Sequence, residues 1–248
     1  MKRLLLVAAL ATATLANAQE IRNGEALLRA MHDRYQSTWY QTVTFTQKST
    51  TYKPDGATSA ETWYEAALPP GKLRIDIGTA SEGNGYIFAD GNLTVVKANK
   101  VAQTIPEVNI LLVLGFDVYR QDPEATIKVV KDKGYDLSKL REDTWEGHPV
   151  YVVGAAKDDL KSKQFWVAKG TLLFLREIEP AREDTAKSED IRFEDYRQLS
   201  GGWIAARVEM YSEAKKVFQE EYTEIQANVK LSPSTFDPQQ FSTTHWEK

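Results

Sequence analysis

The sequence contains one pattern used in nucleophilic catalysis, the S-x-x-K spacing of Ser212 and Lys215. In enzymes with this motif, a lysine one helical turn after a serine activates the serine hydroxyl as a nucleophile. Here the two residues fall in a predicted turn between strands rather than on a helix, and the accompanying Lys-Thr-Gly motif is absent from the sequence. We therefore interpret Ser212 as a turn residue and not as a nucleophile.

Two further patterns are weak signs of chemistry. Gly83-Asn84-Gly85 lacks the third glycine and the following helix of a phosphate-binding loop, so a hairpin loop is the simpler interpretation. Acidic pairs such as Asp158-Asp159 and Glu220-Glu221 carry the carboxylates that acid–base catalysis or calcium binding requires, but none lies in a D-x-D-x-D-G loop. We expect these acidic pairs to be solvated charges.

Composition narrows the possible functions further. The absence of cysteine excludes disulfides, thiol nucleophiles and cysteine-ligated metals. The three histidines, His32, His148 and His245, are far apart, so a shared metal site would require three distant segments to converge. A formal net charge of -4 provides no attraction to phosphate backbones. We expect a protein that is not an enzyme, holds no metal or other cofactor, and binds no nucleic acid.

The first 18 residues have the three parts of a secretory signal peptide. Lys2 and Arg3 precede an apolar run over residues 4–13, and Ala16-Asn17-Ala18 forms a small-x-small cleavage site. The run is shorter than the roughly 20 apolar residues that a membrane span needs. No cysteine follows the cleavage site to accept a lipid, and a cysteine-free exported chain of this size is typical of the bacterial periplasm. We expect residues 1–18 to be cleaved and residues 19–248 to form one domain in the periplasm.

Three segments have helical patterns. Leu27, Leu28, Met31 and Tyr35 fall at helical spacing within residues 20–36, which predicts an amphipathic helix. Residues 108–116 are apolar nearly all the way round, and their leucine content favours a short buried helix. A third helix is predicted over residues 123–133, with an Asp-Pro start and a glycine at position 134 as its stop.

The rest of the chain is predicted to form a series of strands joined by short turns. Residues with period-two alternation recur along the chain, and we count about eleven strands. This predicts an α+β fold with a single antiparallel sheet that curls into an unclosed half-barrel, because wide sheets twist, with short helices as a lid. In the strand of residues 72–77, Arg74 and Asp76 alternate with apolar residues and are expected to face solvent.

The alternation also suggests which side chains point inward. We assign the following residues to the concave face: Val43, Phe45, Leu73, Ile75, Ile77, Val152, Trp166, Leu173 and Leu175. Two interpretations remain open for the helices over this face. They fill the interior as an ordinary core, which periodicity alone favours, or they cover a cavity for an apolar ligand.

Several short motifs, taken in order, give a resemblance to a known family. They include Phe45-Thr46-Gln47, Trp63, the segment Pro69-Pro70-Gly71-Lys72-Leu73-Arg74, Ala89-Asp90-Gly91 and the closing Ser234-Thr235-Phe236-Asp237-Pro238. With the signal peptide and the apolar helix, this order resembles the LolA-like periplasmic lipoprotein carriers, whose outline the LolB and RseB-type domains share. The resemblance spans most of residues 19–248. It implies an unclosed barrel with helices over a cavity that receives acyl chains.

By the same resemblance, particular residues line the cavity and its lid. The implied cavity residues are Val43, Phe45, Trp63, Leu73 and Ile75, and the implied lid residues are Leu111, Leu112 and Leu114. The family's carriers have a basic latch residue just before the proline that precedes the third strand. This chain has Leu68 there, and alternation points its nearest arginine, Arg74, away from Leu73.

The resemblance implies a function that the residues alone do not. The first hypothesis is a periplasmic carrier that binds the acyl chains of a lipoprotein or lipid for transfer toward the outer membrane. Its partners would be an inner-membrane donor complex and an outer-membrane acceptor. The alternative is a non-enzymatic envelope sensor or partner-binding domain of the same fold. A hydrolase ranks third, because the sequence offers no Ser/His or paired-carboxylate constellation.

Overall fold

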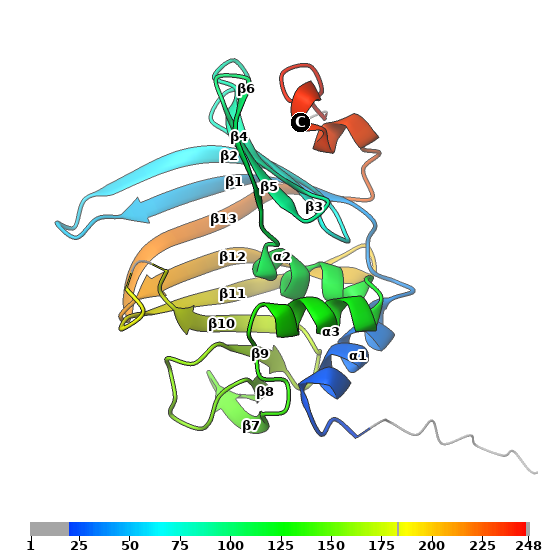
Figure 1. Cartoon of the computed structure of the whole chain (residues 1–248), viewed down its shortest axis with the longest axis vertical. Helices are drawn as coiled ribbons and strands as arrows, with labels where there is room; N and C mark the ends of the chain where they lie inside the picture. Colours follow the sequence, from blue (N-terminus) through cyan, green and yellow to red (C-terminus); the bar gives the residue numbers. More distant parts are fainter. Residues whose placement is uncertain (1–19, 183, 247–248) are drawn as a thin grey trace, which may run out of the picture.

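A computed structural model describes residues 20–182 and 184–246, so the predicted signal peptide lies outside the described residues. The chain forms one antiparallel sheet in the order β6-β5-β4-β3-β2-β1-β13-β12-β11-β10-β9-β8-β7, curled but not closed (Figure 1). The strands span β1 Val43–Tyr52, β2 Thr58–Leu68, β3 Lys72–Ile77, β4 Asn84–Ala89, β5 Asn92–Lys97, β6 Lys100–Pro106, β7 Leu140–Trp145, β8 His148–Val153, β9 Gln164–Ala168, β10 Phe174–Pro180, β11 Ser188–Leu199, β12 Gly202–Ser212 and β13 Lys215–Ala227.

The predicted α+β half-barrel is confirmed, but the sheet has thirteen strands among the described residues rather than about eleven. The sequence analysis did not identify β6. Most residues of β6 are exposed, so the strand has no alternation of apolar and polar positions. A tight hairpin joins it to β5, with Ala98 and Asn99 both at positive φ, as in a type I′ turn.

All three predicted helices are present on one side of the sheet (Figure 1). The helices are α1 Gly24–Tyr35, α2 Ile110–Gly115 and α3 Pro123–Asp132, with 3-10 turns η1 Asp117–Tyr119, η2 Pro233–Phe236 and η3 Pro238–Gln240. Side chains cap all three α-helices: Asn23 caps α1, Asn109 caps α2 and Asp122 caps α3. No helix in residues 20–182 and 184–246 is long and apolar enough to cross a membrane.

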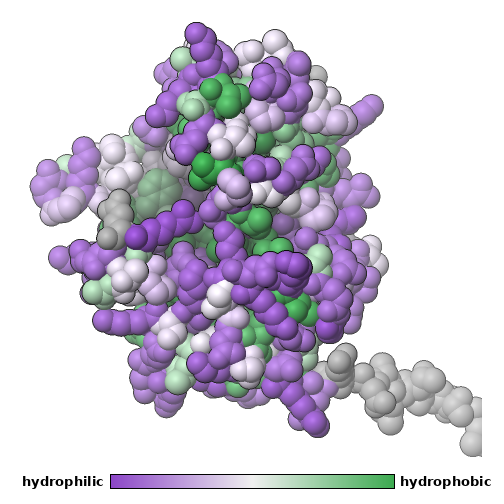
Figure 2. Space-filling model, viewed as in Figure 1, coloured by the Kyte–Doolittle hydropathy of each residue, from purple (hydrophilic) through white to green (hydrophobic). Residues whose placement is uncertain are grey.

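The main hydrophobic core lies between the helices and the concave face of the sheet. Leu27, Leu28 and Met31 of α1 are fully buried there, together with Phe165 and Phe174 from the sheet. Figure 2 shows that, on the face viewed, hydrophobic side chains surface only as small areas among hydrophilic ones. The helices therefore cover most of the apolar surface on the concave side of the sheet.

The assignment of Val152, Trp166 and Leu175 to the concave face was wrong. Val152 and Trp166 are paired across β8 and β9, and they pack with Val150 in a separate cluster. Their chain neighbours Val153 and Phe165 belong to the main core instead. Because successive residues of a strand point to opposite sides, the separate cluster lies on the convex face.

The convex side of β3 was expected to face solvent, but it is buried. Arg74 and Asp76 point away from the main core, as alternation predicted, but their exposed fractions are only 0% and 4%. The segment after β13, which contains η2 and η3, packs over them (Figure 1). A segment more than 150 positions later in the chain thus converts an expected solvent-facing side into a second buried region.

Candidate functional site

The concave face contains a small cavity between the sheet and α2, which we call the central cavity. Its volume is about 90 Å³. The sheet side is formed by Phe45, Trp63, Ala67, Leu73, Ile75, Phe193, Val208 and Met210, and the helix side by Asn109, Leu111, Leu112 and Phe116. Glu65, Glu220 and Tyr222 complete the lining. The cavity is therefore apolar over most of its wall, with polar groups contributed by β2 and β13.

Strand register explains why these side chains gather. Phe45 on β1 is the direct neighbour of Glu65 on β2, and Glu65 is the direct neighbour of Ile75 on β3. Directly paired residues of antiparallel strands share a face, so one row of side chains crosses the sheet under α2. The rings of Phe45 and Tyr222 stack with centroids 4.2 Å apart, which extends the row to β13.

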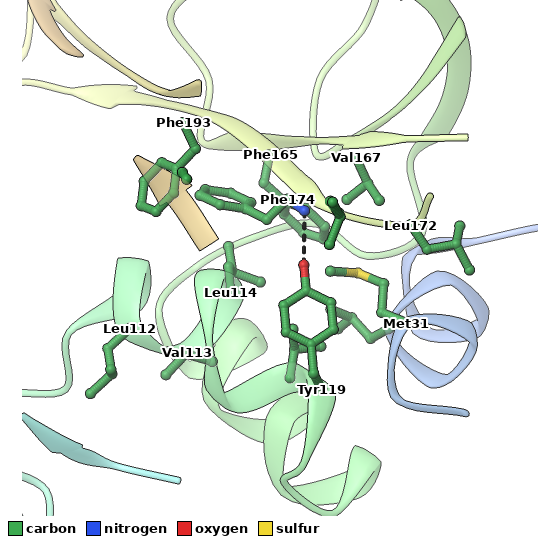
Figure 3. Packing of buried hydrophobic residues seen from close by; sticks show 14 of the residues in the cluster. Met31, Leu112, Val113, Leu114, Tyr119, Phe165, Val167, Leu172, Phe174 and Phe193 are labelled. Carbon is green, nitrogen blue, oxygen red and sulfur yellow. Dashed lines mark hydrogen bonds between the residues drawn. The ribbon is translucent and has the colours of Figure 1, made fainter. Parts of the chain in front are cut away.

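The helix α2 is the part of the wall that does not belong to the sheet. It is only six residues long, and the Asn109 side chain accepts hydrogen bonds from the backbone N–H groups of Leu111 and Leu112, at 3.0 and 3.2 Å. Val113 and Leu114 lie on its core side near Phe174 and Tyr119 (Figure 3). The backbone N–H of Phe174 donates a 2.9 Å hydrogen bond to the Tyr119 hydroxyl, tying η1 to the sheet.

The structure brings six of the eight predicted site residues to this cavity. Phe45, Trp63, Leu73, Ile75, Leu111 and Leu112 line the central cavity. Val43 and Leu114 are fully buried in the same core without lining it. The other basic residue near the third strand, Lys72, starts β3 and is partly exposed.

Two further cavities adjoin α2. One has a volume of about 570 Å³ and shares Asn109 and Leu111 with the central cavity. The other has a volume of about 150 Å³ and shares Asn109 and Leu112. The same short segment is thus a common wall of all three spaces.

Four polar side chains form a cluster on the concave face, which we call the carboxylate cluster: Gln47, Glu65, Glu220 and Tyr222. Tyr222 donates from its hydroxyl to Glu220 Oε2 at 2.5 Å, and Gln47 also hydrogen-bonds the Glu220 carboxylate. The expectation that Glu220 is a solvated charge was wrong. Glu220 stands two residues from Tyr222, and Glu65 two residues from Trp63, so period-two spacing was the signal for their inward position.

The environment of the carboxylate cluster favours protonated carboxyl groups. Burial raises the pKa of Glu220 to about 7, with hydrogen bonds from Tyr222 and Gln47 acting in the opposite direction. Burial, followed by the negative charge of Glu220, raises the pKa of Glu65 well above its ordinary value. In both cases removal from water disfavours the charged form.

The described residues offer no arrangement for metal chemistry. Within residues 20–182 and 184–246, no group of three or more His, Asp or Glu side chains is placed to hold a metal ion. The S-x-x-K residues Ser212 and Lys215 end β12 and begin β13, as the turn interpretation predicted, and His148 is exposed at the start of β8. The central cavity is where most of the predicted ligand-binding residues come together.

Three solved bacterial structures have the same fold as this chain. A DUF1329 family protein from Desulfovibrio piger is 15% identical with a TM-score of 0.56, over 86% of this chain and 95% of that one. A LolA superfamily protein from Nitrosomonas europaea is 15% identical with a TM-score of 0.56, over 84% and 96%. A domain named as an outer membrane lipoprotein-sorting protein, from Vibrio parahaemolyticus, is 13% identical with a TM-score of 0.58, over 88% and 98%.

These similarities establish a LolA-like fold for the chain. No family model matches the sequence, and no match was found among curated proteins. At such low identity the relationship is one of backbone architecture and not of shared site residues.

Proposed function

We propose that this protein is a non-enzymatic periplasmic carrier that shields the acyl chains of a lipoprotein or lipid in the central cavity. The observation that carries the proposal is an apolar cavity that is closed on one side by a single short helix, α2. In this proposal the carrier receives its cargo from an inner-membrane donor and delivers it to an outer-membrane acceptor. The LolA-like fold, and the lipoprotein-sorting name of one structural neighbour, support this assignment.

Ligand entry requires a movement of α2. Sites for small ligands have volumes of about 300–1,000 Å³. The central cavity, at about 90 Å³, is much smaller, whereas the adjoining cavities of about 570 and 150 Å³ would supply the missing space. Displacement of Leu111 and Leu112 would join the three, so we infer that the structure represents a closed state.

Burial of the acyl chain supplies the affinity. Each methylene group removed from water contributes about 0.8 kcal/mol, so ten buried methylenes contribute about 8 kcal/mol before the entropic costs of association. An outer-membrane acceptor must offer a competing apolar surface for release, because the carrier itself holds no energy source in this scheme.

Quenching of Trp63 fluorescence tests the proposal directly. Trp63 lines the central cavity, so a brominated fatty alcohol bound there should quench its emission in a saturable manner. Replacing Trp63 by Phe should remove most of the quenching while leaving binding intact. Leu111→Asp, which places a charge on the cavity wall, should weaken binding at least about tenfold. Leu160→Asp is the matched control, because Leu160 is 50% exposed and does not line the cavity.

The result also separates the carrier from the alternative role. Absence of saturable quenching, with no bound acyl mass in native mass spectrometry, would reject the carrier. A sensor or partner-binding domain of the same fold would then become the leading hypothesis, to be pursued through protein partners rather than lipids.

A further inference from the structure

The carboxylate cluster has a composition that a purely apolar carrier would not need. Glu65 is 6% exposed and lines the central cavity, yet in residues 20–182 and 184–246 no hydrogen bond or ion pair engages its carboxylate. Burying a charged group without a partner costs several kcal/mol, and an apolar side chain of similar size would avoid that cost. A ligand group that interacts with the Glu65 carboxylate would explain why a carboxylate, rather than an apolar side chain, faces the cavity.

A second carboxyl group, that of Glu220, faces the cavity from the other side; unlike Glu65 it is hydrogen-bonded and only partly buried. It lines the cavity from β13, with Tyr222 and Gln47 as its hydrogen-bond partners. No lysine, arginine or histidine of the described residues pairs with either Glu65 or Glu220. Two acidic groups thus face one apolar space with no protein cation to balance them.

Gln47 provides an independent indication. Its side chain is fully buried on β1 between the two acidic strands, and its register partners are Trp63 on β2 and Tyr222 on β13, both cavity residues. The amide nitrogen donates to Ser49 Oγ at 2.8 Å, whereas the amide oxygen Oε1 has no hydrogen-bond partner in the described structure. A buried acceptor without a donor is rare, so Gln47 adds an unsatisfied polar atom directly behind the cavity wall formed by Trp63 and Tyr222.

We propose that the central cavity takes an amphiphile whose polar end is a protonated amine, held by the carboxylates of Glu65 and Glu220. A primary ammonium carries three N–H donors and no acceptor. On the cavity wall, the carboxylate cluster offers the carboxylate oxygens of Glu65 and Glu220 as acceptors and has no cation, so its chemistry complements that group. The apolar wall formed by Phe45, Leu73 and Ile75 would take the alkyl portion.

The raised pKa values of Glu65 and Glu220 are consistent with this assignment. An empty cavity tolerates the pair by holding protons, whereas a bound ammonium would supply the missing positive charge and favour the ionised carboxylates. This inference rests on the proposed function, since it names the class of amphiphile that the carrier's cavity selects.

The test compares three ligands with the same alkyl chain: dodecylamine, dodecanol and dodecanoate, each below its micelle concentration, by isothermal titration calorimetry. We expect dodecylamine to bind about tenfold more tightly than dodecanol, and dodecanoate to bind more weakly than both. In Glu65→Gln and Glu220→Gln the preference for the amine should fall to about threefold or less, while dodecanol binding is retained and reports that the variants are folded.

Glu221→Gln is the matched control. Glu221 is adjacent to Glu220 but its carboxylate pairs with Lys48 at 3.4 Å, and its side chain is 44% exposed. This variant removes the same charge from the molecule, so an unchanged amine preference would exclude a general effect of net charge. An amine preference that Glu65→Gln leaves intact would overturn the inference.

Two further outcomes separate the inference from the proposed function. Equal binding of all three ligands would overturn the role of the carboxylate cluster but would still support the proposed carrier function. Failure of all three to bind would overturn both.

Discussion

The guanidinium of Arg74 and the carboxylate of Asp76, two residues apart on β3, form a fully buried two-point ion pair on the side of the sheet opposite the central cavity. Arg74 Nε lies 2.8 Å from Asp76 Oδ1, and Nη2 lies 3.2 Å from Oδ2. The remaining guanidinium N–H groups donate to the backbone carbonyls of Thr235, Phe241 and Thr244. All five N–H donors of the arginine are thus engaged, three of them by the C-terminal segment.

Replacing Arg74 by Ala should destabilise the protein and release the C-terminal segment. The substitution leaves the buried Asp76 without its arginine partner and with only the His245 ring nearby, 3.6 Å away. A loss of about 3–5 kcal/mol is expected when one partner of a buried ion pair is removed. It also removes the cation–π contact with Phe241, whose centroid lies 4.1 Å from the guanidinium carbon. Urea unfolding should show the loss, and limited trypsin digestion should show faster cleavage after Lys230.

Arg197→Ala is the control for this prediction, because Arg197 is an exposed arginine of β11. Its effect on the free energy of unfolding should lie within about 0.5 kcal/mol. Equal stability losses in the two variants would show that the buried ion pair contributes nothing specific.

Asp117 makes the stability of the protein depend on pH. It is 1% exposed, its Oδ1 atom has no hydrogen-bond partner in the described structure, and burial raises its pKa to about 7 despite a hydrogen bond from the Gly71 backbone. The native state therefore holds a proton that the unfolded chain releases near pH 4, and the free energy of unfolding falls as the pH rises from about 4 to 7.

Asp117→Asn should remove this part of the pH dependence. The variant should match the natural protein near pH 4 and exceed its stability at pH 8 by up to about 4 kcal/mol, at about 1.4 kcal/mol per pKa unit. Denaturant unfolding at the two pH values measures the difference. Asp158→Asn, at an exposed loop position, should leave the difference between pH 4 and pH 8 unchanged. Identical pH profiles for natural protein and Asp117→Asn would contradict the argument.

Asn109→Ala should make the lid open more often. The side chain caps a helix of only six residues, and loss of such a cap costs about 1 kcal/mol. If α2 must move before a ligand enters, this local loss raises the open population, and stopped-flow quenching of Trp63 by a brominated fatty alcohol should become about fivefold faster.

Asn23→Ala provides the comparison for Asn109→Ala. Asn23 caps α1 by accepting from the Ala26 N–H at 2.8 Å, and it lies outside the central cavity lining. If Asn23→Ala loses a similar amount of stability but binds at an unchanged rate, the faster binding of Asn109→Ala is specific to α2. Equal acceleration in both variants would show that general loosening, rather than the lid, controls entry.

Local chemistry in the sequence determined most of the elements. Asp122 and Pro123 start α3, the apolar segment of residues 108–116 contains α2, and alternation in Leu73, Arg74 and Ile75 defines β3 together with its two sides. Each of these features depends on residues only a few positions apart, so each can be recognised from the sequence alone. β6 lacked any such local signal because it is exposed on both faces.

Only the tertiary structure decided which side of each strand is covered, and by what. Alternation states that Val152 and Val153 point to opposite faces, but it does not say which face is concave. It places Arg74 away from the cavity, but the C-terminal segment that buries it arrives from more than 150 positions along the chain. In the same way, Glu65 and Glu220 line one cavity from either side of β1 only because β13 pairs with β1. Contacts of this kind depend on strand order and curvature, which no local pattern encodes.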